Sequence, residues 1–267
     1  MRKFAIALGL VLAGLGASAA RAAGIIDAPG ANLVVSLIPY GPGNVYWERF
    51  GHDAIQIRDR VSGQSYDFNY GVFDFDEKGF FWNFARGYMH YMIDAEPSDV
   101  DESAYVDDGR SVLVQRLALT PAQAASLRDF LLWNLRPDHA IYDYNYLTNN
   151  CATRVRDALD HALGGAIRAA LLARPAMMTY REQIVRLMSP QPWLMLAIDL
   201  GMGPMADRPL DAWQESFLPA VLARDMRLVK VANGHGGFEP VVSGERSVAP
   251  NRLRPPPARP PNLAWPL

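Results

Sequence analysis

The sequence predicts an α+β fold, in which an antiparallel sheet packs on helices and a helical C-terminal extension follows. Residues 52–58 alternate between apolar and polar positions, and after a turn residues 65–70 form the return strand of a β-hairpin. Helical periodicity dominates later, most clearly over 151–163. A mostly helical pattern, interrupted by prolines, continues over 166–222. Strands early in a chain and helices late in it are typical of the α+β class.

The first residues are expected to form a cleaved secretory signal peptide, with an uncleaved anchor as the alternative. Arg2 and Lys3 precede an apolar stretch over residues 4–15, and small residues with two A-x-A matches follow it. The apolar stretch is short for a transmembrane span. Cleavage after residues 1–23 removes three basic groups and no acidic ones, so the formal net charge falls from −2 to −5. We therefore expect an exported, periplasmic protein without a nucleic-acid partner.

The first strand is expected over residues 32–38, and a loop rich in proline and glycine follows it over 39–44. In the hairpin, Ile55 and Ile57 share one face of their strand and are expected to face the core. His52 falls on the opposite face of the same strand. Its side chain should therefore point away from that core, toward a cleft or solvent.

The segment 71–93 is dense in aromatic residues. One interpretation is a helix that packs its rings into the core. The other is a surface that grips an acyl chain or a membrane interface, because Trp and Tyr combine an apolar body with a polar tip. Both interpretations remain open at the level of sequence.

A strand over residues 111–119 leads into a helix with a well-marked start. Thr120 suits the N-cap, Pro121 suits the first helical position, and Gln123 completes a capping box. This helix should end near Leu135.

The loop 136–150 leads to the best-defined helix of the sequence. Val155, Leu159 and Leu163 recur every four residues and mark its buried face. Gly164-Gly165 should end the helix. The only cysteine of the chain then stands in its first turn.

These patterns divide the chain into four parts. Two short strands are expected over 228–242, and the chain from residue 249 on is rich in proline and should form an extended, poorly packed tail. The predicted parts are a signal peptide over 1–23, a core over 24–165, a mostly helical extension packed on it over 166–248, and the Pro-rich tail over 249–267.

Cys151 has no cysteine partner in the chain and cannot form an internal disulfide. Asn149 and Asn150 precede it, and a helix follows. The unpaired N–H groups and the dipole at a helix N-terminus favour a thiolate, so Cys151 is a candidate nucleophile. A buried, unreactive cysteine is the alternative interpretation.

His52 is the candidate base for this thiol, since a thiol and an imidazole form a working catalytic pair. His139 lies twelve residues before Cys151 and is the second candidate. His161 lies ten residues further along the same helix, about 15 Å away along its axis, which disfavours it. The sequence has no C-x-x-C and no H-E-x-x-H motif, so we predict neither a metal site nor a cofactor.

A set of short segments, each weak alone, follows a fixed order along the chain. The segments are Phe50-Gly51-His52, Asn69-Tyr70-Gly71-Val72-Phe73-Asp74-Phe75, Gly87-Tyr88, Gly109-Arg110-Ser111-Val112, Leu117-Ala118-Leu119-Thr120, Asn150-Cys151-Ala152-Thr153-Arg154-Val155-Arg156-Asp157 and Phe217-Leu218-Pro219. As an ordered set over roughly residues 30–225, they resemble the N-terminal periplasmic domain of Lnb, a bacterial lipoprotein N-acyltransferase. That domain is similar to circularly permuted NlpC-type, papain-like thiol enzymes, in which the histidine strand precedes the cysteine helix.

The resemblance implies a circularly permuted papain-like core over residues 24–165, with Cys151 as nucleophile and His52 as base. The third, polar member would come from the strand after His52, where Asn69 is the first choice and Asp67 the second. The backbone N–H of Cys151 would be among the oxyanion donors.

Arg154, Asn150 and Arg110 are the candidate substrate-binding residues. Arg154 lies three residues after the thiol on the same face of the helix, where it could hold a phosphate or a carboxylate. A structural ion pair with Asp157 is the alternative for Arg154, and Arg110 is open to both kinds of role.

The expected function is that of a periplasmic cysteine-dependent acyltransferase or acyl hydrolase, which acts on lipid or lipoprotein acyl groups through a thioester. Membrane phospholipid or a lipoprotein is the expected partner, with peripheral contact to the membrane. Lnb continues into a membrane part and this sequence into a Pro-rich tail, so lipid should be reached from the periplasmic face. The alternatives are a cell-wall peptide amidase or peptidase with the same pair of residues, and a non-catalytic envelope binding module.

Overall fold

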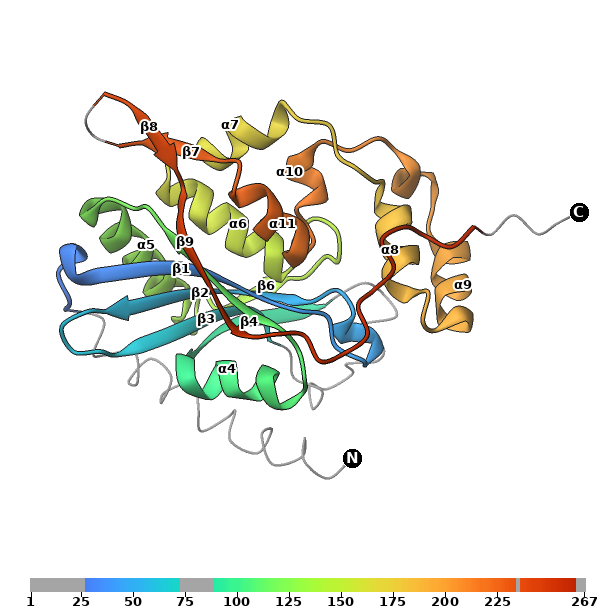
Figure 1. Ribbon diagram of the computed structural model, residues 1–267, viewed down its shortest axis with the longest axis horizontal. Helices are drawn as coiled ribbons and strands as arrows, with labels where there is room; N and C mark the ends of the chain where they lie inside the picture. The colour runs from blue at the N-terminus through green and yellow to red at the C-terminus, as the bar shows by residue number, and fades with distance from the viewer. Residues whose placement is uncertain (1–26, 73–88, 234–235, 263–267) are drawn as a thin grey trace, which may run out of the picture.

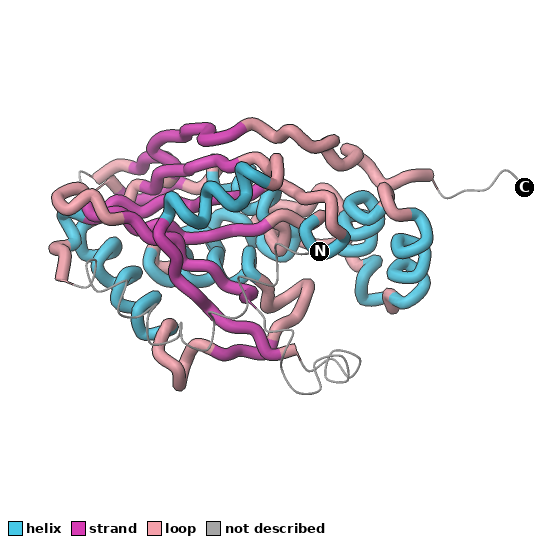
Figure 2. Tube along the Cα trace, turned by 90° about the horizontal axis from the view of Figure 1, so that it is seen from below, coloured by secondary structure: helices cyan, strands magenta, loops and turns pink. Residues whose placement is uncertain are grey.

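The computed structural model describes residues 27–72, 89–233 and 236–262. At its centre is a seven-stranded antiparallel sheet with the order β6-β4-β3-β2-β1-β5-β9 (Figure 1). Figure 2 shows these strands as one continuous, twisted layer. The strands are β1 (Leu33–Tyr40), β2 (His52–Asp59), β3 (Ser65–Val72), β4 (His90–Pro97), β5 (Val112–Leu117), β6 (Ile141–Asp143) and β9 (Val242–Ala249).

Helices cover both faces of the sheet. α4 (Ser98–Asp107) lies on one face, and α5 (Pro121–Asn134) and α6 (Cys151–Ala162) lie on the other (Figure 1). The remaining elements of the described chain are α7 (Ala166–Leu172), α8 (Tyr180–Met188), α9 (Pro192–Gly201), α10 (Ala212–Glu215), α11 (Pro219–Met226), the 3-10 turns η2 (Gly30–Asn32), η3 (Tyr46–Glu48) and η4 (Pro204–Asp207), and the hairpin of β7 (Lys230–Ala232) and β8 (Phe238–Pro240).

The expected α+β architecture with an antiparallel sheet is confirmed. β2 and β3 form the predicted hairpin, with Ala54 opposite Asn69. The predicted start of α5 is also confirmed, because Thr120 Oγ1 accepts from the Gln123 N–H at 3.3 Å and Gln123 Oε1 accepts from the Thr120 N–H at 2.9 Å.

Both faces of the central strands are buried, which the alternation over 52–58 did not reveal. Ile55 and Ile57 face the main core beneath α5 and α6, as predicted. Ala54 belongs to a second apolar cluster with Tyr40 and Val112, against which Tyr105 of α4 packs. The face that carries His52 is therefore covered by a helix rather than left to solvent.

Some predictions lie outside the described residues, and others differ from the structure. The signal peptide and most of the aromatic segment, residues 73–88, lie outside the described residues. The helical interpretation is wrong for the end of that segment, because His90 begins β4, whose buried residues alternate as in a strand paired with β3. The loop 136–150 contains the short strand β6, and β9 was not predicted because most of its side chains are exposed.

The Pro-rich tail is extended, as predicted, and the structure shows where it is attached. The Arg252 N–H donates to Gly109 O at 2.8 Å, and Arg186 Nη1 donates to Pro257 O at 2.9 Å. In Figure 1 this segment, coloured red, runs past α8. Among the described residues, no helix is both long enough and apolar enough to cross a bilayer.

Gly51 determines how the chain enters β2. Its φ is +81°, a left-handed conformation that residues with a side chain rarely adopt. A Cβ at this position would lie 2.8 Å from the carbonyl oxygen of Tyr40, the residue that pairs with His52. A glycine here therefore allows the two strands to close at the end where His52 lies.

We expect Gly51→Ala to lower the free energy of unfolding by about 1–3 kcal/mol, because it adds backbone strain and a clash with a carbonyl group. Gly63→Ala is the matched control: Gly63 also has a positive φ, of +77°, but a Cβ there would meet nothing within 4 Å. Gly63→Ala should lower the free energy of unfolding only through the backbone strain of a left-handed φ, by about 1 kcal/mol. Urea unfolding measures both, and equal losses would contradict a role for the Tyr40 contact.

Candidate active site

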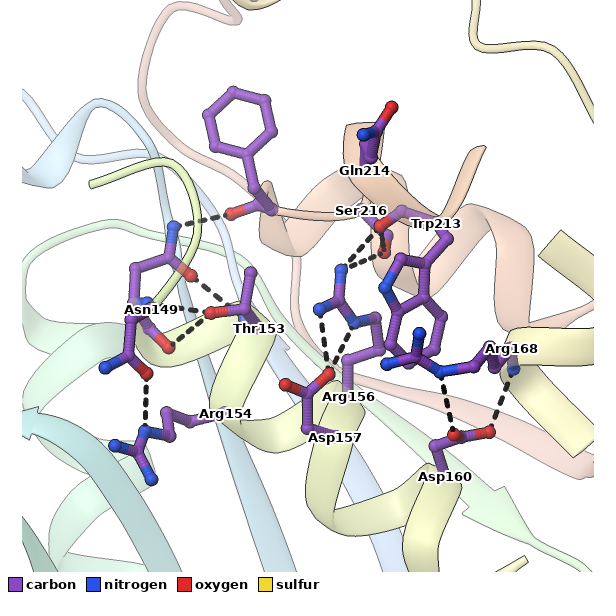
Figure 3. Close-up of polar contacts among 12 residues, drawn as sticks. Asn149, Thr153, Arg154, Arg156, Asp157, Asp160, Arg168, Trp213, Gln214 and Ser216 are labelled. Carbon is purple, nitrogen blue, oxygen red and sulfur yellow. Dashed lines mark hydrogen bonds and ion pairs between the residues drawn. The ribbon is translucent and has the colours of Figure 1, made fainter. Parts of the chain in front are cut away.

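Cys151 is the first residue of α6, and Asn150 is the N-cap of that helix. Asn150 Oδ1 accepts from the Thr153 N–H at 2.9 Å, and Thr153 Oγ1 accepts from the Asn150 N–H at 2.7 Å. The Asn150 amide also donates to Tyr146 O at 2.8 Å and to Phe217 O at 3.0 Å. The backbone that carries the thiol is thereby attached both to the preceding loop and to the segment before α11 (Figure 3).

The second turn of α6 is attached to α10. The Arg156 guanidinium lies 3.7 Å from the centre of the Trp213 ring, and its Nη1 donates to Trp213 O. Its other side pairs with Asp157 at 2.8 Å, as Figure 3 shows. Arg156 is almost fully buried, so these contacts replace its hydration and fix the position of the helix.

His52 is the first residue of β2 and lies beside two aromatic rings, those of Tyr40 and Tyr105, which stack on each other at 3.7 Å. The imidazole is nearly parallel to both rings, with centroids 6.0 Å away in each case and interplanar angles of 16° and 9°. His52 Nε2 lies 2.9 Å from Asn69 Oδ1 on the neighbouring strand β3. Two aromatic neighbours and one hydrogen bond therefore define the orientation of the imidazole.

Asp101 of α4 fixes the orientation of Asn69. The Asn69 Nδ2 group donates to Asp101 Oδ2 at 3.1 Å, so the amide oxygen must face His52. An amide oxygen only accepts, so His52 Nε2 carries the proton of that hydrogen bond. His52 Nδ1 is then the nitrogen with a free lone pair, and it makes no hydrogen bond to the part of the chain that the structure describes.

Tyr40 connects Asp101 to a second buried carboxyl group. Tyr40 Oη lies 2.7 Å from Asp101 Oδ2 and 2.8 Å from Asp67 Oδ2. A phenol has one proton, so one of these contacts requires a proton on the carboxyl group. Burial, together with the nearby Asp101 charge, raises the pKa of Asp67 to about 7, although hydrogen bonds from Ser98 and Gln56 oppose the shift. The network behind Asn69 therefore holds an extra proton near neutral pH.

Cys151 and His52 line one cavity of about 530 Å³. It opens between the start of β2, the end of β3, the start of α6 and one side of α4. Its other lining residues include Asn69, Gly71, Asp101, Tyr105, Arg110, Tyr144 and the η3 residues Tyr46, Trp47 and Glu48. The structure thus brings together the three residues that the sequence analysis favoured as nucleophile, base and polar third member.

Gly71 allows α6 to approach the end of β3. It has a φ of +97° and lies at an irregularity in the β3–β4 pairing, between Tyr70 and Val72. A Cβ on Gly71 would lie 3.5 Å from the Cβ of Cys151. A side chain at this position would therefore start in contact with the Cys151 side chain.

Burial holds both the thiol of Cys151 and the imidazole of His52 in their neutral forms. Burial lowers the pKa of His52 to about 4; the hydrogen bond to Asn69 opposes this shift and the nearby Arg110 charge adds to it. Burial also raises the pKa of Cys151 to about 12, with a further contribution from Asp53. The backbone N–H groups of Asp53, Ala152 and Cys151 lower it, as expected at a helix N-terminus, but their effect is the smaller one. The expected lowering of the thiol pKa is therefore wrong for the resting protein.

Asp53 is a buried acid beside the thiol. Its side chain is fully inaccessible to solvent, and neither carboxyl oxygen has a hydrogen-bond partner among the described residues. Burial raises the pKa of Asp53 well above its usual range. Burial therefore favours the neutral form of the Asp53 carboxyl group, and its ionisation would oppose formation of a thiolate at Cys151.

We expect Asp53→Asn to stabilise the protein by about 1–3 kcal/mol at pH 8, because it removes an unpaired acid from the interior. An acid whose pKa is raised by folding favours the folded state at low pH and loses that effect as pH rises above its unfolded pKa. The gain in the free energy of unfolding should therefore grow from pH 4 to pH 8. Urea unfolding at several pH values measures it, and a gain independent of pH would contradict this assignment.

The remaining candidates occupy different positions. Arg110 lines the cavity, donates from Nε to Gly41 O at 2.7 Å, and places its guanidinium 4.4 Å from the Tyr105 ring centre. Arg154 donates to Asn149 Oδ1 at 2.7 Å and lies 4.2 Å from the Tyr142 ring centre. Neither Arg154 nor Asn150 is among the described residues that line the cavity.

The alternative role for Arg154, an ion pair with Asp157, is not what the structure shows, because Asp157 pairs with its neighbour Arg156. Sequence reasoning also missed Asp101 and Tyr105, which belong to α4. Their spacing of four residues could have indicated both, because it places a carboxylate and an aromatic ring on one face of a helix. Within the described ranges, no three His, Cys, Asp or Glu side chains are grouped as ligands of a metal ion.

Comparison with known proteins agrees with the resemblance noted in the sequence. Residues 26–186 match the family model described as the Lnb N-terminal periplasmic domain. Among curated proteins and among solved structures, none matches the chain. The match covers more than half of the 267 residues and includes the hairpin, α4 and α6. The chain therefore belongs to the Lnb N-terminal periplasmic domain family, and its location is the periplasm.

Proposed function

We propose that the protein is a periplasmic cysteine-dependent acyltransferase or acyl hydrolase that acts on lipid or lipoprotein acyl groups. The observation that carries this proposal is the cavity shared by Cys151, at the start of α6, and the His52–Asn69 pair. In this proposal the core is a circularly permuted papain-like, NlpC-type fold. The order of the histidine strand β2 before the cysteine helix α6 supports that assignment.

In the proposed reaction, Cys151 Sγ attacks the carbonyl carbon of an ester while His52 Nδ1 accepts the thiol proton. Because both groups are neutral at rest, proton transfer accompanies the attack rather than preceding it. The backbone N–H groups at the start of α6 stabilise the developing negative charge. The C–O bond then breaks, the proton passes from His52 to the departing alcohol, and a thioester remains on Cys151.

An amine or a water molecule then attacks the thioester, and His52 takes its proton. The acyl group leaves as an amide or as a free fatty acid, and the proton returns to the thiol. Asn69 keeps the imidazole in the tautomer whose Nδ1 is free, and Asp101 keeps Asn69 in the matching orientation. Arg110 faces the same cavity and is the proposed contact for an anionic part of the substrate.

The test is the intact mass of the mature protein after incubation with phospholipid, together with measurement of released fatty acid. We expect an acyl-sized mass increase that hydroxylamine removes, or fatty-acid release, and neither from Cys151→Ala. Cleavage of cell-wall peptides, with no acyl product, would instead identify an amidase or peptidase. The absence of product from either substrate class would favour a non-catalytic envelope binding module.

The acid limb of the pH–rate profile should report the lowered pKa of His52. Only neutral imidazole accepts a proton, so we expect kcat/KM to hold down to about pH 5 and to fall tenfold per pH unit below about pH 4. Since the hydrogen bond to Asn69 raises the His52 pKa, Asn69→Ala should move this limb to lower pH. It should also lower kcat/KM about tenfold or more, because the imidazole loses its orientation. A limb near pH 6.5 in the wild-type protein would contradict the buried, neutral imidazole.

A further inference from the structure

The helix α9 carries an apolar stripe that no described residue covers. Trp193 and Leu200 are 85 % and 87 % exposed, and Leu196 between them is 38 % exposed. At spacings of three and four residues, these side chains lie on one face of the helix. The opposite face, around Met195, packs against α8, so α9 is firmly seated and presents its stripe outward.

The charges around α9 favour an anionic partner. Asp199, the only acidic residue of the helix, is paired with Arg181 at 2.8 Å. A second cavity, of about 500 Å³, lies next to the start of the helix, where Ser189 and the tail meet the loop before β2. Its charged lining residues are Arg49 and Arg254, and neither guanidinium has an acidic partner among the described residues.

We propose that α9 and the arginine-lined cavity form a docking site for a bilayer surface that contains anionic phospholipid. An interfacial helix places Trp and Leu at the boundary between headgroups and acyl chains, and nearby arginines attract phosphate groups. A guanidinium also matches the geometry of a phosphate through paired hydrogen bonds. The apolar stripe and the two arginines, which have no acidic partner among the described residues, thus provide the two kinds of contact that such a surface requires.

The position of the docking site suits the proposed function. The purpose that we assign to the docking site rests on that function. Tyr46, Trp47 and Glu48 of η3 line the cavity of Cys151, while Asn44 and Arg49, on either side of η3, line the arginine cavity. The two cavities are therefore separated by a single turn of chain. Lipid held at α9 would lie beside the entrance through which an acyl ester reaches the thiol. Residues 192–201 and 254 lie outside the family match, whereas Asn44 and Arg49 lie within it.

Vesicle flotation of the mature protein tests the proposal without requiring any reaction. Vesicles of phosphatidylcholine alone are compared with an equimolar mixture of phosphatidylcholine and phosphatidylglycerol. We expect binding to the mixture, weakened by salt, and a partition coefficient lowered about tenfold or more by combining Trp193→Ser with Leu200→Ser. Combining Arg49→Gln with Arg254→Gln should abolish the preference for the anionic vesicles while leaving the weaker apolar binding.

Phe238→Ser is the matched control. Phe238 is 75 % exposed on β8, which Figure 1 places at the opposite end of the molecule from α9, and its loss should leave flotation unchanged. Cys151→Ala should float like the wild-type protein, so failure of docking and failure of the thioester proposal are separate results. The proposal is overturned if the wild-type protein does not float, or if Phe238→Ser weakens binding as much as the α9 variant. It is also overturned if the stripe instead holds two copies together, seen as a dimer that the α9 variant dissociates.

Discussion

Replacing Cys151 by serine is expected to lower turnover of an acyl ester by about 10³-fold or more, within the range that loss of a nucleophile costs other hydrolases. Serine has nearly the same size, so the cavity should remain intact. A hydroxyl group is far less acidic than a thiol, and His52, with a pKa of about 4, is too weak a base to compensate. The measurement is kcat/KM for release of fatty acid, at the pH where the wild-type protein is most active.

The same variant separates a chemical role of the thiol from a packing role. Circular dichroism and urea unfolding should show that Cys151→Ser folds with nearly wild-type stability, since the residue is only partly buried. Cys151→Ala should be as inactive as Cys151→Ser. Retention of full turnover by the serine variant would contradict a thioester and leave the cysteine as a packing residue.

Replacing Asn150 by alanine is expected to lower the free energy of unfolding by about 3 kcal/mol. About one third of this is the loss of the N-cap acceptor for the Thr153 N–H. The rest comes from the carbonyl groups of Tyr146 and Phe217, which lose their donor at a partly buried and a buried position, respectively. Urea unfolding provides the measurement.

Asn150→Ser is the comparison that divides these contributions. Serine keeps an oxygen that can cap α6 but has no amide to reach Tyr146 O or Phe217 O. Its loss of stability should therefore be smaller than that of Asn150→Ala. If the two variants were equally stable, the cap would contribute nothing. If alanine cost less than about 1 kcal/mol, the two carbonyl groups would have to be satisfied by water.

The parts of the fold that could be predicted are those whose signals lie within a few residues. Thr120 and Gln123 satisfy each other across one helical turn, and Asn150 caps α6 in the same way. The face of His52 follows from the two-residue period of a strand. These features depend on local geometry, so the sequence alone was sufficient for them.

The missing parts of the site depend on packing between distant segments. Asp101 meets Asn69 from 32 residues away, on a helix whose polar sequence has no clear buried face. The pKa of Cys151 is raised because burial and Asp53 outweigh the N–H groups of the helix end, and neither effect can be read from the residues around the thiol. The division of the chain at residues 165 and 248 remains a prediction.

The hydrogen bond from Asn150 to Phe217 has a consequence for the order in which the protein is assembled. The two residues are 67 positions apart, and Phe217 lies beyond the part of the chain that matches the family. A chain that emerges from its N-terminus exposes the cysteine helix well before the segment that completes its cap. Newly exported protein therefore passes through a stage at which the thiol is present but its helix is not yet secured. The distance along the chain therefore separates in time the export of Cys151 from the completion of the cap of α6.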